Sequence, residues 1–197
     1  MKLSVKTRNV LRGLKQSWGT SRIKRSLWNK EFAEGHWDFI ENTADDIVYP
    51  YIEKYSRNGS ILDLGCGSGN TGCELNSNSY REYTGVDISD VALRKASERS
   101  RTCGRAQKNH YVQHDIASYS PIRKYDVILF RESIYYIPRI RIKGMLERYA
   151  RYLEPEGVFI VRWHDSKVGS EIVDFPFRVI EKYSTAGGPC IVVFRTS

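Results

Sequence analysis

The stretch ILDLGCGSGNTG, residues 61–72, constrains the fold of this chain more than any other segment. A short, mostly apolar run is followed at once by closely spaced glycines, the pattern of a buried strand that ends in a turn. Two glycine patterns overlap in this turn: D-x-G-x-G-x-G begins at Asp63, and G-x-G-x-x-G begins at Gly67. Glycines at such spacings let a ligand approach the main chain closely, so the turn predicts a binding site at the end of a strand.

The register of the strand decides between the two patterns. If Gly67 were the first glycine of the turn, Gly65 and Cys66 would lie inside the strand, where glycine is unfavourable. If Gly65 is the first, the strand ends cleanly after Leu64 and three alternate positions without side chains face the ligand. The first pattern suits a sulfonium cofactor and the second a dinucleotide, so the register favours the sulfonium cofactor.

Strand-like and helix-like runs alternate along the rest of the chain. Strands are expected at 60–64, 81–87, 109–115, 125–130, 157–163, 176–184 and 188–196, and helices at 43–57, 89–101 and 140–153. Such alternation is typical of parallel crossover units, whereas the short TAGG link before the last strand favours an antiparallel hairpin. The predicted fold is therefore α/β: an open, mostly parallel seven-stranded sheet with helices on both faces and a C-terminal hairpin.

The helix expected at 43–57 has uncertain bounds. Thr43 and Asp46 stand at a spacing similar to that of a capping box, which would begin the helix there. Pro50, however, would bend or restart it, because proline lacks the amide proton that an interior helical position donates.

Positive charge is concentrated at the N-terminus. Residues 1–30 hold nine of the 31 Lys and Arg and no Asp or Glu, so the remainder carries 22 basic against 23 acidic groups. Two interpretations stay open. The segment contacts phosphate, an anionic lipid surface or an acidic substrate, or it is a helix that packs its apolar side chains on the domain. Those side chains are Val10, Leu11, Leu14 and Trp18.

Composition limits the class of protein further. The 197 residues, 41% of them apolar, suffice for one domain with a substantial core, and they include no apolar run of membrane-spanning length and no secretory signal. A cytoplasmic protein is expected. No C-x-x-C pair occurs, so we expect reduced packing thiols, without a disulfide or a metal site. The cysteines are Cys66, Cys73, Cys103 and Cys190.

An acidic residue follows the glycine turn at a suitable distance. Asp87 stands about 20 residues after the turn and closes the second expected strand. A carboxylate there can accept hydrogen bonds from both hydroxyls of an adenosine ribose. Sulfonium and dinucleotide cofactors both contain that ribose, so Asp87 predicts a nucleoside without deciding between them.

The chain contains an ordered set of motifs in which it closely resembles the class I S-adenosylmethionine-dependent methyltransferases, specifically those of small-molecule type. The matching stretches are ILDLGCGSGN, YTGVDIS around Asp87, QHDI at 113–116, YDVILFRESIYYIP at 125–138 and LEPEGVFIV at 153–161. The resemblance covers roughly residues 45–197. It implies a Rossmann-like methyltransferase fold, an enzyme that uses S-adenosyl-L-methionine, and S-adenosyl-L-homocysteine as the by-product.

The resemblance also implies a set of cofactor-binding residues. The glycine turn would hold the methionine and ribose portions through Asp63, Gly65, Cys66, Gly67, Gly69 and Asn70. Asp87 would bind the ribose with Ile88 on the adenine, Asp115 would accept from the adenine amino group beside Ile116, and Phe130 and Arg131 would border the methionine.

Candidate catalytic residues follow the fourth and fifth strands, because open α/β sheets bind ligands at the carboxyl ends of their strands. Transfer of a methyl group from sulfonium to a nucleophile needs alignment first, and a base only where the acceptor must lose a proton. The candidates are Glu132, Tyr136, His164 and Asp165, of which Glu132 and His164 are favoured. Glu-x-x-Tyr-Tyr from Glu132 also resembles the equivalent stretch of nodulation-type N-methyltransferases.

An aromatic segment precedes the sheet. In comparable methyltransferases this region covers the cofactor as a lid, which predicts a basic helical segment and lid over 1–44 and a methyltransferase domain over 45–197. The lid and substrate contacts would be Trp28, Phe32, His36, Trp37 and Tyr135. An anionic small-molecule acceptor, methylated on oxygen or nitrogen, is a natural hypothesis next to so many basic residues.

Three other functions are alternatives to a small-molecule methyltransferase. An RNA methyltransferase would use the basic arm, but FRES stands where an N-P-P-Y-type tetrad would follow the fourth strand, so nucleic acid is not the expected partner. A nicotinamide oxidoreductase is disfavoured by the strand register and by the terminal hairpin. A non-catalytic S-adenosylmethionine-binding protein would retain the cofactor residues and methylate no acceptor.

Overall fold

The computed structural model describes residues 5–40, 44–164 and 177–196. One seven-stranded sheet forms the centre of the molecule, with strand order β3-β2-β1-β4-β5-β7-β6. Its strands are β1 Gly59–Leu64, β2 Tyr80–Asp87, β3 Asn109–Gln113, β4 Tyr125–Arg131, β5 Leu153–Trp163, β6 Phe177–Ser184 and β7 Cys190–Thr196.

Strands β1 to β5 run parallel, while β7 pairs antiparallel with both β5 and β6. The open, mostly parallel sheet with a C-terminal hairpin is thus confirmed. Its central strands are almost continuously buried, because helices cover both faces.

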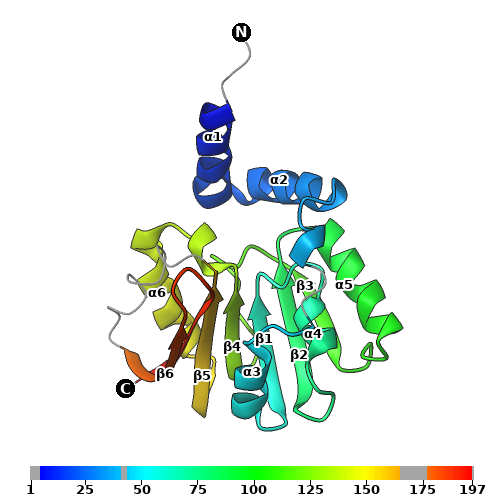
Figure 1. Cartoon of the computed structure of the whole chain (residues 1–197), viewed down its shortest axis with the longest axis vertical. Coiled ribbons are helices and arrows are strands. Elements are labelled where there is room, and N and C mark those ends of the chain that lie inside the picture. Colours follow the sequence, from blue (N-terminus) through cyan, green and yellow to red (C-terminus); the bar gives the residue numbers. More distant parts are fainter. Residues whose placement is uncertain (1–4, 41–43, 165–176, 197) are drawn as a thin grey trace.

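The helices lie on both faces of the sheet and across its carboxyl edge (Figure 1). They are α1 Val5–Trp18, α2 Ser21–Ala33, η1 Asp38–Ile40, α3 Tyr49–Ser56, α4 Asn70–Glu74, α5 Asp90–Thr102, η2 Ile134–Tyr136 and α6 Arg139–Ala150. Leu62 and Leu64 of β1 belong to the core cluster of α6, whereas Ile61, the neighbour of Leu62, belongs to that of α3. The alternation of side chains along one strand therefore serves two hydrophobic layers.

Two expected helix bounds were wrong. The helix expected at 43–57 begins only at Tyr49, with Pro50 in its first turn, where the missing amide proton costs nothing. Thr43 lies outside the described residues, and Asp46 accepts from the amide of Val48 at 3.1 Å. The helix expected at 140–153 ends at Ala150, since Leu153 already opens β5.

The N-terminal helices lie above the carboxyl ends of the parallel strands (Figure 1). The interpretation that Val10, Leu11, Leu14 and Trp18 pack on the domain was wrong, because their exposed fractions are 41–59%. The helix faces the domain with polar side chains instead: Arg12 pairs with Glu31 of α2, and Gln16 is buried. Among the described residues, no helix has the length and apolarity needed to cross a bilayer.

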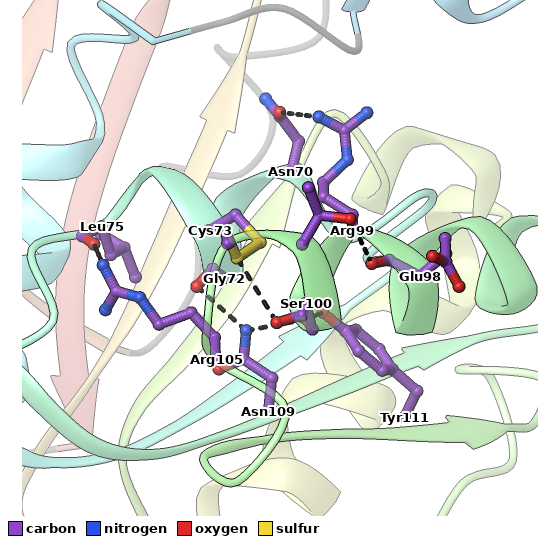
Figure 2. Close-up of a disulfide and its surroundings, with 12 residues drawn as sticks. Asn70, Gly72, Cys73, Leu75, Glu98, Arg99, Ser100, Arg105, Asn109 and Tyr111 are labelled. Carbon is purple, nitrogen blue, oxygen red and sulfur yellow. Dashed lines mark hydrogen bonds between the residues drawn. A yellow bond between two sulfur atoms is a disulfide. The ribbon is translucent and has the colours of Figure 1, made fainter.

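Two of the four cysteines form a disulfide. Cys73 of α4 is bonded to Cys103, the residue that ends α5, and Figure 2 shows the bond between these two helices. The expectation of reduced thiols holds for the buried Cys66 and Cys190 but was wrong for this pair, because residues 30 apart in sequence meet when α4 and α5 pack together. Disulfides are uncommon in the cytosol, so the cysteines do not support the cytoplasmic prediction, which stays a prediction.

Candidate functional site

A cavity of about 480 Å³ opens at the carboxyl ends of β1, β2 and β4, beneath α1 and α2. Its volume lies within the ordinary range for small-molecule sites. The lining residues that the sequence singled out are Trp28, Phe32, Trp37, Asp63, Gly65, Cys66, Gly67, Asn70, Asp87, Ile88, Asp115, Ile116, Arg131, Glu132, Tyr135, Tyr136 and His164. One cavity therefore brings together residues from the glycine turn, from the stretches around Asp87, Asp115 and Glu132, and from the aromatic segment before the sheet.

The glycine turn begins where the favoured register placed it. Strand β1 ends at Leu64, and Gly65, Gly67 and Gly69 all have positive φ angles, of 87°, 54° and 75°. Side chains rarely adopt this conformation, so the turn requires glycine. A Cβ on Gly65 would also lie 2.5 Å from that of Ser133.

Asp87 lies against the glycine turn. Its Oδ2 accepts from the amide of Gly67 at 2.9 Å, and its Oδ1 accepts from the amide of Ser89 at 2.8 Å. Burial raises the pKa of this carboxyl, while these amide bonds act in the opposite direction. The two amides fix the carboxylate at the cavity wall, next to the main chain of the turn.

Asp63 is more deeply buried, with 1% of its surface exposed. Its Oδ2 accepts from the hydroxyl of Tyr83 at 2.6 Å, while its Oδ1 has no hydrogen-bond partner within the part of the chain that the structure describes. Burial raises the pKa of Asp63 to about 6, and the bond from Tyr83 and the charge of Arg131 oppose this rise. The unpaired oxygen is suited to a ligand that brings a positive charge or a hydrogen-bond donor.

Asp115 is tied to α2. Its Oδ2 accepts from Lys24 Nζ at 3.2 Å, in an ion pair whose two side chains are almost completely buried, and from the hydroxyl of Ser21 at 3.2 Å. Its Oδ1 accepts from the amide of Ala117. The lysine of the N-terminal segment thus neutralises an acidic residue of the cavity and holds α2 over it.

Four charged side chains form a linked network beside the cavity. Arg131 donates to Asp46 Oδ2 from Nε at 3.0 Å and from Nη2 at 2.8 Å, and Arg162 donates to Asp46 Oδ1 at 3.3 Å. Arg162 also pairs with Oε1 of Glu132, whose Oε2 accepts from Tyr135 at 2.7 Å. Because both oxygens of Glu132 are engaged, its carboxylate is held in place within the protein.

Aromatic rings form the upper wall. The ring of Trp28 meets that of Tyr136 edge-on at 4.7 Å and lies 5.5 Å from that of Trp37, while Tyr135 and Tyr136 lie 4.6 Å apart. Burial raises the pKa of Tyr136 to about 12 and that of Tyr135 above its ordinary value, so both phenols stay protonated near neutral pH. Rings from α2 and η2 thus enclose the cavity with apolar surface.

Three predicted site residues do not line the cavity. Phe130 is fully buried in the core with α6, Gly69 faces Ala96 of α5, and His36 lies largely exposed beside Glu34. Asp165 lies outside the described residues. The roles assigned to the remaining residues stay predictions.

Several lining residues were missed by the sequence analysis. They are Gln16, Lys24, Phe39, Ser68, Thr71, Ser133, Ile137 and Arg162. Gln16 is the most informative, because its amide nitrogen is buried and has no hydrogen-bond partner within the described residues. Its position on a surface helix gave no sign of burial. Arg162 stands at the end of β5 beside His164, so the strand-end rule could have found it.

Comparison with known proteins agrees with the methyltransferase resemblance seen in the sequence. Residues 61–157 match the model of the methyltransferase domain family. The trans-aconitate 2-methyltransferase of Acidovorax sp. (strain JS42) is 35% identical over 107 residues, 54% of this chain and 38% of that protein. The malonyl-[acyl-carrier protein] O-methyltransferase 2 of Ilyobacter polytropus is 24% identical over 144 residues, 70% of this chain and 54% of that protein.

The chain spans about half the length or less of these curated relatives. Among solved structures, the N-methyltransferase NodS from Bradyrhizobium japonicum WM9, in complex with S-adenosyl-L-homocysteine, superposes with a TM-score of 0.69 at 16% identity. That match covers 87% of this chain and 97% of the other. At this identity the likeness shows the fold.

Proposed function

The chain belongs to the class I S-adenosylmethionine-dependent methyltransferases, and from this premise we propose that it methylates a carboxylate oxygen of a small-molecule acid. The observation that carries the proposal is one cavity with two chemically different ends. Asp63, Asp87 and bare main chain lie at one end, where Arg131 neighbours Asp63, and the Arg162–Glu132 pair, a histidine and aromatic rings lie at the other.

The first end fits S-adenosylmethionine. Asp63 offers an unpaired, buried carboxylate oxygen, which suits the ammonium group of the methionine portion. Asp87 and the amides of the glycine turn suit the ribose, because a carboxylate fixed by two amides can accept from both hydroxyls. The cofactor would supply a methyl group on a positively charged sulfur, which becomes neutral on transfer.

The second end fits an anion. Arg162 and His164 lie on its wall, Arg162 in ion pairs with Asp46 and Glu132, and the buried amide nitrogen of Gln16 has a donor to offer. Both curated relatives described above are named for acceptors that carry carboxylates, trans-aconitate and a malonyl group. These features support an acceptor held by its negative charges.

A carboxylate acceptor also agrees with the state of two of the predicted catalytic groups, Glu132 and Tyr136. Glu132 is engaged at both oxygens, and Tyr136 holds its proton because burial raises its pKa to about 12. A carboxylate has no proton to lose, so alignment and the exclusion of water suffice for the reaction. The aromatic wall of Trp28, Trp37 and Tyr136 would exclude water.

The test is a by-product assay with chemically matched acceptors. The full chain is incubated with S-adenosylmethionine and di- and tricarboxylic acids, with the corresponding amides and alcohols as controls. Acids are expected to release S-adenosylhomocysteine and give methyl esters that mild alkali hydrolyses. Gln16→Met should raise the KM for the acid roughly tenfold, as expected for a lost hydrogen bond to a charged group, and leave cofactor affinity unchanged.

Two results would contradict the proposal. Turnover confined to amines or alcohols, with methyl groups stable to alkali, would show that the acceptor atom is different. Binding of S-adenosylhomocysteine without turnover of any acceptor would favour the non-catalytic alternative.

The contacts of the basic residues bear on the RNA alternative. Arg12 pairs with Glu31, Lys24 with Asp115, and Arg25 with Asp90. These three cations are occupied with acids of the same chain, so they have less charge to offer to phosphates. Retention of RNA at low salt with a steep salt dependence would argue for RNA instead.

A further inference from the structure

Helix α1 is amphipathic in the reverse of the usual sense. A surface helix ordinarily turns its apolar stripe toward the core and its polar face toward water. In α1, Arg12 and Gln16 face the domain, where Arg12 forms a bidentate pair with Glu31 at 2.6 and 2.9 Å and Gln16 reaches the cavity. The apolar stripe is therefore left facing away from the protein.

The stripe is continuous along the helix. Val10, Leu14 and Trp18 follow at intervals of four residues, and Leu11 lies beside them, so all four share one face. On a helix that turns about 100° per residue, Leu14 and Gln16 are roughly 200° apart, on nearly opposite sides. In the folded chain, the polar face of α1 therefore makes intramolecular contacts and its apolar face is exposed.

Helix α6 extends this apolar surface. The guanidinium of Arg141 lies 5.1 Å from the ring of Trp18, so the start of α6 is next to the end of α1. Ile140, the neighbour of Arg141, is 84% exposed, and Figure 1 shows the first turn of α6 close to the base of α1. We call Val10, Leu11, Leu14, Trp18 and Ile140 the apolar surface.

The charges nearest the apolar surface are basic. Lys15 follows Leu14 on α1, Arg22 lies at the start of α2, and Arg141 lies at the start of α6; further along α6, Lys143 pairs with Glu147. The sequence has no acidic residue before Glu31. A second copy of this chain would bring cations against cations, so self-association is a poor fit, whereas an anionic surface matches both the apolar and the basic groups.

We propose that α1 and the start of α6 bind the surface of an anionic phospholipid bilayer. An apolar stripe with Trp and Leu, bordered by Lys and Arg, is the composition of helices that lie in the membrane interface. The apolar side chains enter the boundary between headgroups and acyl chains, and the basic side chains contact the headgroups. The helix lies on the membrane and does not cross it.

The experiment is co-sedimentation of the full-length chain with vesicles. One set contains phosphatidylcholine and phosphatidylglycerol, and the other contains phosphatidylcholine alone. The wild-type chain is expected to bind the anionic vesicles, to bind the neutral ones much more weakly, and to lose affinity as salt is raised. Leu14→Ser and Trp18→Ser should each lower the partition coefficient roughly tenfold or more, because each removes a large apolar group from the interface.

Matched controls come from the opposite end of the sheet. Ile122 is 96% exposed and Lys124 is also exposed, in the segment just before β4, away from the carboxyl ends where α1 lies. Ile122→Ser and Lys124→Gln should leave binding unchanged, whereas Lys15→Gln should lower it roughly fivefold. A cooperative thermal unfolding transition is the check that each variant is folded.

Three outcomes would overturn the proposal. The wild-type chain fails to bind anionic vesicles at low salt, or the variants of the apolar surface bind as the wild type does. In the third, sedimentation without lipid shows a dimer that Leu14→Ser dissociates, which would mean that a second copy covers the apolar surface. None of these depends on methyl transfer, so this inference and the proposed function fail separately.

Discussion

Replacing Asp63 by Asn tests whether the cavity carries a destabilising buried charge. The side chain is almost completely buried, its Oδ1 lacks a partner among the described residues, and burial raises its pKa to about 6 from an ordinary 3.8. Asn has nearly the same shape and still accepts from Tyr83. The change therefore removes the ionisation and little else.

The sign follows from linkage between protonation and folding. A group whose pKa is higher in the folded state favours folding fully below the unfolded pKa, and this contribution is lost as pH rises through the folded pKa. A rise from 3.8 to about 6 corresponds to roughly 3 kcal/mol, of which about 2.4 kcal/mol falls between pH 4 and pH 7. The wild-type chain should lose that much stability relative to Asp63→Asn over this interval.

Urea unfolding of both chains at half-unit steps from pH 4 to pH 7.5 gives the difference directly. Because all other titrating groups are shared, they cancel in the comparison between the two chains. A difference in the free energy of unfolding that is constant with pH, or that changes in the opposite direction, would refute the assignment of a raised pKa to Asp63.

Binding of S-adenosylhomocysteine should favour the ionised form of Asp63, which folding alone disfavours. If Asp63 binds the ammonium of the methionine portion, only its ionised form is competent, and the ionised fraction falls about tenfold between pH 7 and pH 5. The affinity for S-adenosylhomocysteine should fall by the same factor, and Asp63→Asn should bind weakly at every pH. An equal pH dependence in both chains would exclude this contact.

The remaining predictions concern the turn, the disulfide and the charge network. Gly67→Ala and Gly104→Ala both place a side chain at positive φ and should each cost about 1–2 kcal/mol of stability, but only the change at Gly67, on the cavity wall, should weaken cofactor binding by calorimetry. Equal losses of affinity would contradict the placement of the turn. Cys103→Ser opens a loop of 30 residues and should lower the free energy of unfolding by roughly 3.5 kcal/mol, a loss that dithiothreitol reproduces in the wild type and does not add to in the variant. Glu132→Gln should reduce kcat for a carboxylate acceptor less than tenfold with an unchanged pH profile, whereas a loss above a hundredfold would identify Glu132 as a base.

The fold was largely predictable because its signals are local. The run before Gly65, the run ending at Asp87 and the TAGG link each mark a strand end or a hairpin through their own residues. The errors arose where a local rule met a stronger constraint. Helix α3 begins later than expected because Pro50 fits only its first turn, and Leu153 belongs to β5 and not to the helix before it.

The candidate site likewise contains residues that local signals could place and residues that they could not. Residues at strand ends, such as Asp87 and Glu132, could be placed from the sequence because strand order fixes their edge of the sheet. Gln16 could not, since its burial depends on how α1 docks. The disulfide was missed for a similar reason: the meeting of Cys73 and Cys103 is a property of helix packing, and their spacing in the sequence does not show it.

Calorimetric titration of S-adenosylhomocysteine into the wild-type chain and Asp87→Ala tests most directly whether the glycine turn and this carboxylate hold the adenosine of a methyl donor. Glu98→Ala is the control, because that exposed carboxylate pairs with Arg101 of the same helix, outside the cavity. The wild type and the control should bind with the same affinity, and Asp87→Ala, with unchanged secondary structure by circular dichroism, should lose roughly thirtyfold or more, as two hydrogen bonds to a charged group disappear. Absence of binding to the wild type, or equal affinity in Asp87→Ala, would contradict the account.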